Sequence, residues 1–391
     1  MKDIKVIDLK TENNRKLIYD NSRLEELKDE LEEFLDDSDM NFMKNRTFAK
    51  KVLFSREIKA NNEIEDYNDD IDEVLNYINN LNNINSKENK QRIINVYKSY
   101  LYILRNRLIP NQINKNNLKR LYSILSNGLL SDEDLSNMGK YYRNNDVYIY
   151  RTNKLYSLNP KDIDKGVDPK DIDIYMNNLF EFIKKNNNKD TDTENFIISQ
   201  IAHFYFVYVH PYFDVNGRTA RTTALWHLIN NKAYPYIIFN RAISFQKSTY
   251  HEVIQDSKEF YNLTFFLNYM LLNVKKELEK EYIMNNIQNN TNAHLTTKNF
   301  QTIEYLLSMN GNITIKDYAY FYKKFNGKKK LMDIYNEDIL PLLDKGVIKE
   351  VRKTKSFINA DINNIELGIN DNKLDIDKSK IKRFNSSLIK K

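Results

Sequence analysis

The sequence predicts a mainly α-helical fold, and three observations lead to this expectation. The chain of 391 residues contains only 8 glycines and 6 prolines, so the residues that most often interrupt helices are scarce. Apolar residues recur at helical spacing in long charged stretches such as NSRLEELKDELEEFLDD, residues 21–37. Only two stretches, residues 141–151 and 347–353, have the alternation that is typical of strands.

Composition narrows the class of protein. The formal net charge of +6 is small for this length, so it neither requires nor excludes a nucleic-acid partner. The absence of cysteine excludes a disulfide framework and thiolate metal sites, and it fits a reducing compartment. Neither a signal-peptide core nor an apolar run of 18 residues occurs. We therefore expect a soluble cytoplasmic protein with no membrane partner, or one exported by a route that leaves no such signal.

Changes in composition divide the chain into five parts. Residues 1–90 are charged and are predicted to form an N-terminal helical region. Residues 91–280 are richer in apolar and aromatic side chains, as a packed catalytic core should be. A polar linker is predicted at 281–298, a small domain at 299–360, and a polar tail at 361–391.

The small domain has the outline of a winged helix-turn-helix. FQTIEYLLSM, TIKDYAYFYKKF and MDIYNEDILPLLDKG are predicted to be helices, and VIKEVRK a strand. Near the second helix lies a basic cluster formed by Lys323, Lys324, Lys328, Lys329 and Lys330. The third helix, which would enter a DNA groove, instead carries Asp333, Glu337 and Asp338, and these would repel phosphates. DNA binding remains open, and we favour a protein-docking role.

The stretch HPYFDVNGRTAR, residues 210–221, joins two predicted helices. The first, TDTENFIISQIAHFYFVYV, begins with a capping box between Thr191 and Glu194. Pro211 cannot continue this helix, so His210 ends it and faces the loop. The second helix follows in RTARTTALWHLI. The loop therefore leads directly into the N-terminus of a helix, and such an N-terminus is a natural binding site for anions.

The residue types in this loop suit phosphate chemistry. Gly217 allows the backbone to approach an oxyanion, and Arg218 and Arg221 can each hold a phosphate through two donors. Asp214 is a hard oxygen ligand for Mg²⁺, and His210 is a base of near-neutral pKa. The chain contains neither G-x-x-x-x-G-K nor G-x-G-x-x-G. We therefore predict phosphoryl or nucleotidyl transfer at this loop, with any nucleotide bound by something other than these two glycine-rich motifs.

These residues resemble the signature H-P-F-x-D-G-N-G-R-x-x-R of Fic domains, most of which transfer AMP from ATP to a Ser, Thr or Tyr hydroxyl of a protein. The resemblance covers roughly residues 95–275. Tyr212 replaces the usual Phe, and Val215 replaces the usual Gly or Ala. We expect the branched side chain of Val215 to crowd the phosphates or slow turnover.

The resemblance implies a role for each residue of the loop. By this resemblance His210 is the general base, and Asp214 is the ligand of Mg²⁺ or Mn²⁺. Asn216 and Gly217 form part of the anion hole. Arg218 binds the phosphates of the nucleotide, and Arg221 binds the terminal phosphate. ATP is then a co-substrate. The other histidines have no motif around them, and we interpret His203 and His227 as core or surface residues.

GKYYRNNDVYIYR, residues 139–151, resembles the flap hairpin of the same family. We expect a hairpin within 141–151 that turns at Asn144, Asn145 and Asp146. The resemblance implies that a target segment adds to the flap as a strand, at Asp146, Val147, Tyr148 and Ile149. A purely structural tyrosine-rich hairpin is the alternative.

EIKANNEIED, residues 57–66, resembles the inhibitory helix S/T-x-x-x-E-G/N of many Fic proteins. Asn61 stands in place of Ser or Thr, and Asp66 in place of Gly or Asn. By this resemblance Glu65 pairs with Arg221 and displaces the terminal phosphate. The alternative interpretation is an acidic, solvated helix face.

The sequence thus predicts a protein adenylyltransferase that is inhibited by its own N-terminal segment. The reverse reaction, removal of AMP with Glu65 orienting water, is an alternative. A Doc-type phosphotransferase is disfavoured because that branch usually has Lys where this chain has Gly217. In a different class, the chain would be a DNA-binding regulator whose Fic domain is inactivated by Val215. The target protein is unknown and includes the chain itself as a candidate, and a homo-oligomer is compatible with the sequence.

Overall fold

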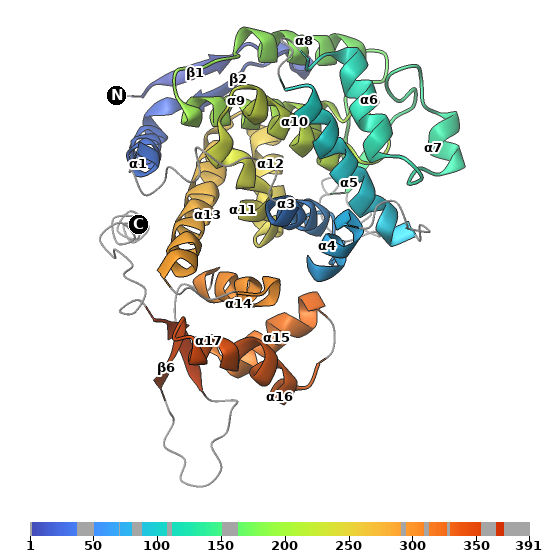
Figure 1. Cartoon of the computed structure of the whole chain (residues 1–391). Helices are drawn as coiled ribbons and strands as arrows, with labels where there is room; N and C mark the ends of the chain where they lie inside the picture. Colours follow the sequence, from blue (N-terminus) through green and yellow to red (C-terminus); the bar gives the residue numbers. More distant parts are fainter. Residues whose placement is uncertain are drawn as a thin grey trace. The chain divides into compact units, whose positions relative to one another are not determined.

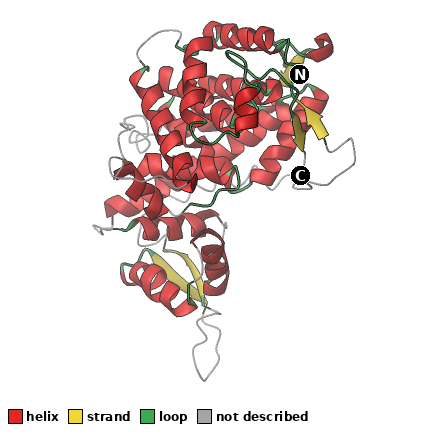
Figure 2. Ribbon diagram, turned by 90° about the vertical axis from the view of Figure 1, so that its right-hand side faces the viewer, coloured by secondary structure: helices red, strands yellow, loops and turns green. Residues whose placement is uncertain are grey.

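The computed structural model describes residues 2–36, 51–69, 71–79, 88–107, 112–150, 163–290, 295–308, 313–326, 329–352 and 365–370. Two compact units are present: Met1–Tyr67 with Val74–Lys275, and Asn68–Glu73 with Lys276–Lys391. Most described residues are helical and the sheets are small, which confirms the predicted fold class (Figures 1 and 2). Most of the predicted polar tail lies outside the described residues. Within the described ranges, no helix combines the length and apolarity needed to cross a bilayer.

Two buried helices form the centre of the larger unit: α9, Asp192–Val209, and α10, Asn216–Asn230. α9 is apolar around most of its circumference, which is typical of a helix inside a core rather than on a surface. α8 (Ile172–Lys185) packs against α9, while α5 (Glu88–Arg105) and α6 (Lys115–Leu125) pack against α10. The side chain of Trp226 in α10 is fully buried among them.

The other helices of this unit lie outside the central pair (Figure 1). They are α1 (Glu25–Asp36), α3 (Lys51–Glu63), α7 (Asp132–Ser136), α11 (Phe239–Ser244) and α12 (Lys247–Phe260), with short 3₁₀ helices at Glu12–Asn14, Asn21–Arg23 and Tyr234–Ile238. α3 packs against α11, α5 and α10, so the segment predicted to be inhibitory (residues 57–66, called the inhibitory segment below) reaches the helix that follows the motif loop. α4 (Ile71–Asn79) and α13 (Thr264–Asn290) each span a boundary between the two units.

The expectation that residues 1–90 are all helical is wrong for the first twenty. β1 (Ile4–Ile7) and β2 (Leu17–Asp20) form an antiparallel pair with Ile4 opposite Asp20. Their sequences, IKVI and LIYD, are rich in β-branched and aromatic residues, which favour strands. The charged residues around them hid this signal.

The flap also differs from the expected hairpin within 141–151. β3, Tyr148–Tyr150, pairs antiparallel with β4, Ile163–Lys165, and Ile149 lies opposite Asp164. Residues 144–146 therefore lead into the first strand and do not form the turn between strands. The alternating pattern located β3 correctly, but its partner lies farther along the chain.

The smaller unit contains the expected helices and strand. α14 (Thr297–Ser308) and α15 (Ile315–Asn326) are followed by a helical stretch made of α16 (Leu331–Ile334), a π-helical turn (Tyr335–Ile339) and α17 (Leu340–Asp344). β5 (Ile313–Thr314), β6 (Ile348–Arg352) and β7 (Glu366–Ile369) form an antiparallel sheet in the order β5, β7, β6. Its identification as a winged helix stays a prediction.

Candidate active site

The motif loop lies between the ends of the two central helices. Thr191 caps α9 by accepting a hydrogen bond from the backbone N–H of Glu194, as predicted. At the other end of α9, His210 adopts a left-handed backbone conformation with φ 52° and ψ 61°, and Pro211 follows. This turn ends the helix and carries the imidazole to the start of the loop.

Val215, the residue before α10, also has a left-handed backbone, with φ 64°. A β-branched residue is a genuine outlier there, since its side chain crowds the backbone, and such strain costs roughly 1–3 kcal/mol. The conformation explains why a glycine suits this position. The side chain of Val215 is only 2% exposed, so it packs into the core and does not cover the surface of the loop.

Asn216 holds the loop closed. Its side-chain oxygen accepts from the backbone N–H of Tyr212 at 3.0 Å, and its amide donates to the Tyr212 carbonyl at 2.8 Å. Because the side chain makes these two bonds, the expected role of Asn216 in an anion hole falls to its backbone N–H. The ring of Tyr212 is buried and stacks on Tyr122 with 3.5 Å between centroids, as a Phe ring could. The hydroxyl that distinguishes it from Phe is buried and has no hydrogen-bond partner among the described residues, so this exchange carries a cost.

Arg218 is a buried cation with unused donors. The residue is 2% exposed, and among the described residues its Nε and Nη1 have no hydrogen-bond partner. The Asp214 carboxylate lies 3.9 Å from Nη2, which is too far for a strong bond. Buried guanidinium donors without partners are costly, so this arrangement indicates a site for an anionic ligand.

Arg221 is held by the inhibitory segment. Its Nη2 donates to the Glu65 carboxylate at 2.7 Å and to the Asn61 carbonyl at 3.1 Å. Its Nε donates to the side-chain oxygen of Asn61 at 2.9 Å, so this amide makes the bond that a Ser or Thr hydroxyl would make. Burial alone would raise the pKa of Glu65, but the charges of Arg221 and Arg218 outweigh it and lower that pKa. Glu65 is therefore a carboxylate at neutral pH.

Glu65 covers the start of α10. A side chain at Gly217 would collide with the Glu65 carboxylate and would come within 3.0 Å of Nη1 of Arg221. Glycine is therefore needed here to admit a negatively charged group at the N-terminus of α10. In this structure that group is a carboxylate of the same chain.

Asp66 explains a second departure from the family pattern. Its backbone is left-handed, with φ 67°, which Gly and Asn adopt readily and Asp tolerates. Lys247 at the start of α12 pairs with the Asp66 carboxylate and donates to the Glu63 carbonyl at 3.0 Å. These contacts fix the backbone on both sides of Glu65.

His210 is neutral at physiological pH. Burial, together with the charges of Lys258 and Arg143, lowers its pKa to about 4, although the Val207 carbonyl and Asp164 act in the opposite direction. A neutral imidazole can accept a proton, as a general base must.

Arg143 is a residue of this site that the motif did not indicate. It is 1% exposed and donates through Nε to the His210 carbonyl at 2.9 Å, through Nη1 to the Asn145 carbonyl at 2.6 Å, and through Nη2 to the Val167 carbonyl at 2.5 Å. The arginine thus ties the flap to the left-handed turn at His210. Periodicity gives no signal for a guanidinium that binds only backbone carbonyls.

The flap lies against the motif loop. A Cβ at Gly166, directly after β4, would come within 2.6 Å of Nη2 of Arg143 and 3.1 Å of the His210 Cβ, so a larger residue here would force a neighbour to move. Of the predicted target-binding residues, Asp146 pairs with Lys165 at 2.8 Å, Val147 accepts a backbone bond from Gly166, and Tyr148 is 58% exposed. Ile149 lies between Tyr148 and Tyr150 in β3.

Asp214 is suited to a metal that phosphates share. Its side chain is 57% exposed, and one oxygen accepts from the Val215 N–H at 2.6 Å. The part of the chain that the structure describes contains no cluster of three or more His, Cys, Asp or Glu residues able to hold a metal ion. Mg²⁺ is commonly bound by one or two carboxylates together with substrate phosphates and water, so a single carboxylate fits.

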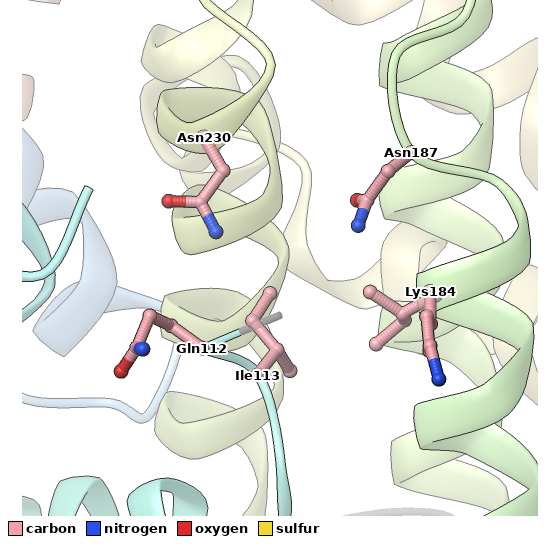
Figure 3. Close-up of a pocket in the computed structure, with 6 residues that line it drawn as sticks. Gln112, Ile113, Lys184, Asn187 and Asn230 are labelled. Carbon is pink, nitrogen blue, oxygen red and sulfur yellow. The ribbon is translucent and has the colours of Figure 1, made fainter. Parts of the chain in front are cut away.

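A small pocket that opens to solvent lies elsewhere in this unit (Figure 3). Lys184 and Asn187 line one side, and Asn230, at the opposite end of α10 from the motif loop, lines the other. It does not include any residue of the candidate active site.

Comparisons with known proteins find a similar family model and similar folds. The model of the Fic/DOC family matches residues 112–228. A search of curated proteins finds no match. Among solved structures, the chain is similar to a Fic family protein from Desulfovibrio desulfuricans G20, with a TM-score of 0.53 and 16% identity over 89% of this chain and 95% of that chain. It is also similar to a fragment of Fic-1 from C. elegans, with a TM-score of 0.46 and 14% identity over 67% of this chain and 71% of that chain. With the motif loop inside the matched range, this chain therefore carries a domain of the Fic/DOC family in residues 112–228.

Proposed function

We propose that this protein transfers AMP from ATP to a hydroxyl group of a protein. The observation that carries the proposal is the buried guanidinium of Arg218, whose Nε and Nη1 lack partners in the described structure. It lies at the N-terminus of α10, 3.9 Å from the exposed carboxylate of Asp214, and the motif loop that leads to this helix begins at the neutral base His210. A polyphosphate fits this arrangement. Its anionic oxygens can accept from the arginine, and it can share a metal ion with the carboxylate.

His210 would take the proton from the target hydroxyl. The hydroxyl oxygen then attacks the α-phosphorus, a new P–O bond forms, and the bond from this phosphorus to the oxygen that bridges to the β-phosphate breaks. Pyrophosphate leaves, and AMP remains on the protein. Arg218 holds the phosphates, and Mg²⁺ at Asp214 would neutralise their charge. The flap strand β3 would hold the target segment through backbone hydrogen bonds, and the exposed side chain of Tyr148 would be free to lie against that segment.

Inhibition by Glu65 is part of the proposal. The carboxylate occupies the Arg221 guanidinium at 2.7 Å and covers Gly217, the two places where a terminal phosphate would bind. ATP could then bind only with its phosphates displaced. Because a misplacement of about 1 Å can cost on the order of a hundredfold in rate, the resting protein would transfer AMP slowly.

For the smaller unit we propose protein docking. Tyr320, Met332 and Leu340 are exposed apolar side chains, which suit a protein partner better than phosphates. Lys329 of the basic cluster pairs with Glu337 at 2.5 Å, which reduces the positive charge available to DNA.

Labelled ATP tests the proposed function. The Glu65→Gly protein, incubated with Mg²⁺ and α-labelled ATP, should transfer label to protein, and γ-labelled ATP should transfer none. His210→Ala in the same background should abolish transfer while nucleotide affinity stays nearly unchanged. Transfer of the γ-label would instead show a phosphotransferase, and label that persists without His210 would exclude it as the base.

A further inference from the structure

Glu65 lies just beyond the helical part of the inhibitory segment. α3 ends at Glu63, and the backbone then turns: the N–H of Asp66 donates to the Glu63 carbonyl and the N–H of Tyr67 donates to the Asn62 carbonyl, both at 3.1 Å. These two bonds around a left-handed residue form a Schellman motif, a common way to end a helix. The position of the Glu65 carboxylate therefore depends on the turn that ends α3.

Asp66 is an unfavourable residue for this turn. It is the left-handed residue, with φ 67°, in a position that glycine usually occupies. Its carboxylate also adds negative charge to the C-terminal end of α3, where the helix dipole is already negative, and it directly follows the carboxylate of Glu65. A nearby cation stabilises a turn of this composition.

Lys247 supplies that cation from another helix. Its ammonium group donates to the Glu63 carbonyl at 3.0 Å and pairs with the Asp66 carboxylate, so it contacts both the last helical residue and the left-handed residue. Lys247 is the first residue of α12, where a positive charge is unfavourable for α12 itself. The favourable contacts of this lysine are therefore those with the end of α3.

The two ends of the inhibitory segment are held differently. At its start the Glu57 carboxylate accepts from Nε of Arg241 in α11 at 2.8 Å, and the two side chains are 0% and 5% exposed. At its end the side chains of Lys247 and Asp66 are 33% and 69% exposed. Breaking a buried ion pair is costly, whereas an exposed one contributes little. The end that carries Glu65 is therefore the part of the segment that opens more readily.

We propose that Lys247 is a positioning residue for the inhibition. It holds the turn that places the Glu65 carboxylate on Arg221, and loss of its charge frees that carboxylate. The inference rests on the proposed function, because it takes Glu65 to be inhibitory. It identifies the contact between α12 and the end of α3 as the point of release, while Glu57 and Arg241 keep α3 in the core.

The first test is the initial rate of AMP transfer from α-labelled ATP, with self-modification as the readout. Lys247→Met keeps most of the length of the side chain and removes its charge. It should raise the rate about fivefold, as loss of an exposed ion pair and of a cation at a helix C-terminus does. In the Glu65→Gly background the same substitution should change nothing, because the carboxylate that Lys247 positions is absent.

Two further variants separate charge from packing. Asp66→Asn removes the carboxylate and suits a left-handed backbone. Combined with Lys247→Met, it should restore inhibition, because no unbalanced charge is left in the turn; a lysine that acted only through packing would not be rescued in this way. Lys185→Met is the matched control, since Lys185 pairs with Asp8 at 3.1 Å on the surface, and this variant should transfer AMP at the wild-type rate.

Hydrogen exchange tests the turn without any nucleotide. The amides of residues 64–67, followed by mass spectrometry, should exchange about fivefold faster in Lys247→Met than in the wild-type protein, while those of α9 stay unchanged. Unchanged exchange in the turn would overturn the inference. So would a Lys247→Met protein that transfers AMP at the wild-type rate while Glu65→Gly is fast, or an equal gain in the Glu65→Gly background. If Glu65→Gly itself transfers no AMP, the proposed function fails, and the exchange still decides whether Lys247 holds the turn.

Discussion

Replacing Glu65 with glycine should turn the resting protein into an active enzyme. The carboxylate meets Nη2 of Arg221 at 2.7 Å, and the two side chains are 27% and 1% exposed. A charge-assisted hydrogen bond in such a setting is worth roughly 1.5–3 kcal/mol. Since about 1.4 kcal/mol corresponds to a tenfold change in an equilibrium, the access of a terminal phosphate to Arg221 should rise by roughly 10- to 100-fold. The rate of AMP transfer should rise by a similar factor.

Initial rates with α-labelled ATP measure this effect, with self-modification as the readout until a target is known. Glu65→Gln should release the inhibition in part, because a neutral amide keeps the shape but loses the charge. Glu63→Gln is the matched control, since Glu63 lies two residues away and pairs with Lys59. Its rate should equal that of the wild-type protein.

Two outcomes would refute this reasoning. If Glu65→Gly binds ATP but transfers AMP no faster than Glu63→Gln, the inhibitory segment is only structural. If Glu65→Gly instead abolishes removal of AMP from a modified protein, Glu65 serves the reverse reaction. The double variant Glu65→Gly with Arg221→Ala should lose the gain, because the freed arginine is the group that the phosphate needs.

Four further changes should have measurable effects. The kcat/KM of the Glu65→Gly enzyme should stay constant as the pH falls from neutrality and should decline only near pH 4. The reason is that His210, with a pKa of about 4, can act as a base while it is neutral. A decline centred at 6.5, the ordinary pKa of histidine, would contradict this. Asp214→Asn should lower the rate at least tenfold at any Mg²⁺ concentration in a metal titration, by roughly the contribution of a phosphate-bound cation. Val215→Gly should change the free energy of unfolding in urea by less than about 1 kcal/mol, since relief of strain offsets lost burial, whereas Val96→Gly inside α5 should cost about 3 kcal/mol or more. Arg143→Lys should lower kcat about tenfold without changing ATP affinity, measured by steady-state kinetics and calorimetry, because a lysine cannot hold three carbonyls in a plane.

Signals from neighbouring residues predicted the central helices of the fold. Contacts between residues far apart in the sequence could not be predicted in the same way. The cap at Thr191 and the stop at Pro211 could be read from neighbouring residues, because capping and the missing N–H of proline act within one turn. The partner of β3 could not be read in this way, because Ile149 pairs with Asp164 across an intervening segment. A strand pattern indicates that a strand exists and leaves its partner open.

The same distinction applies to the site. The residues of the motif loop could be assigned because they are consecutive and their types are informative. Arg143 lies 67 positions before His210, so only the fold brings the two together. Its contacts are with backbone carbonyls, and such partners leave no pattern in the sequence.

The departures from the family pattern preserve the geometry of the site, which argues against reading them as lesions. Asn61 supplies the side-chain acceptor that a hydroxyl would supply to Arg221, and Asp66 keeps the left-handed turn after Glu65 while Lys247 balances its charge. Two departures carry a cost: Tyr212 buries a hydroxyl without a partner among the described residues, and Val215 is a buried residue with a strained backbone. Strain of that kind lowers the stability of the loop without removing a donor from it, because the N–H groups at the start of α10 are the same for any residue at this position. Val215 alone is therefore a weak reason to infer an inactive domain.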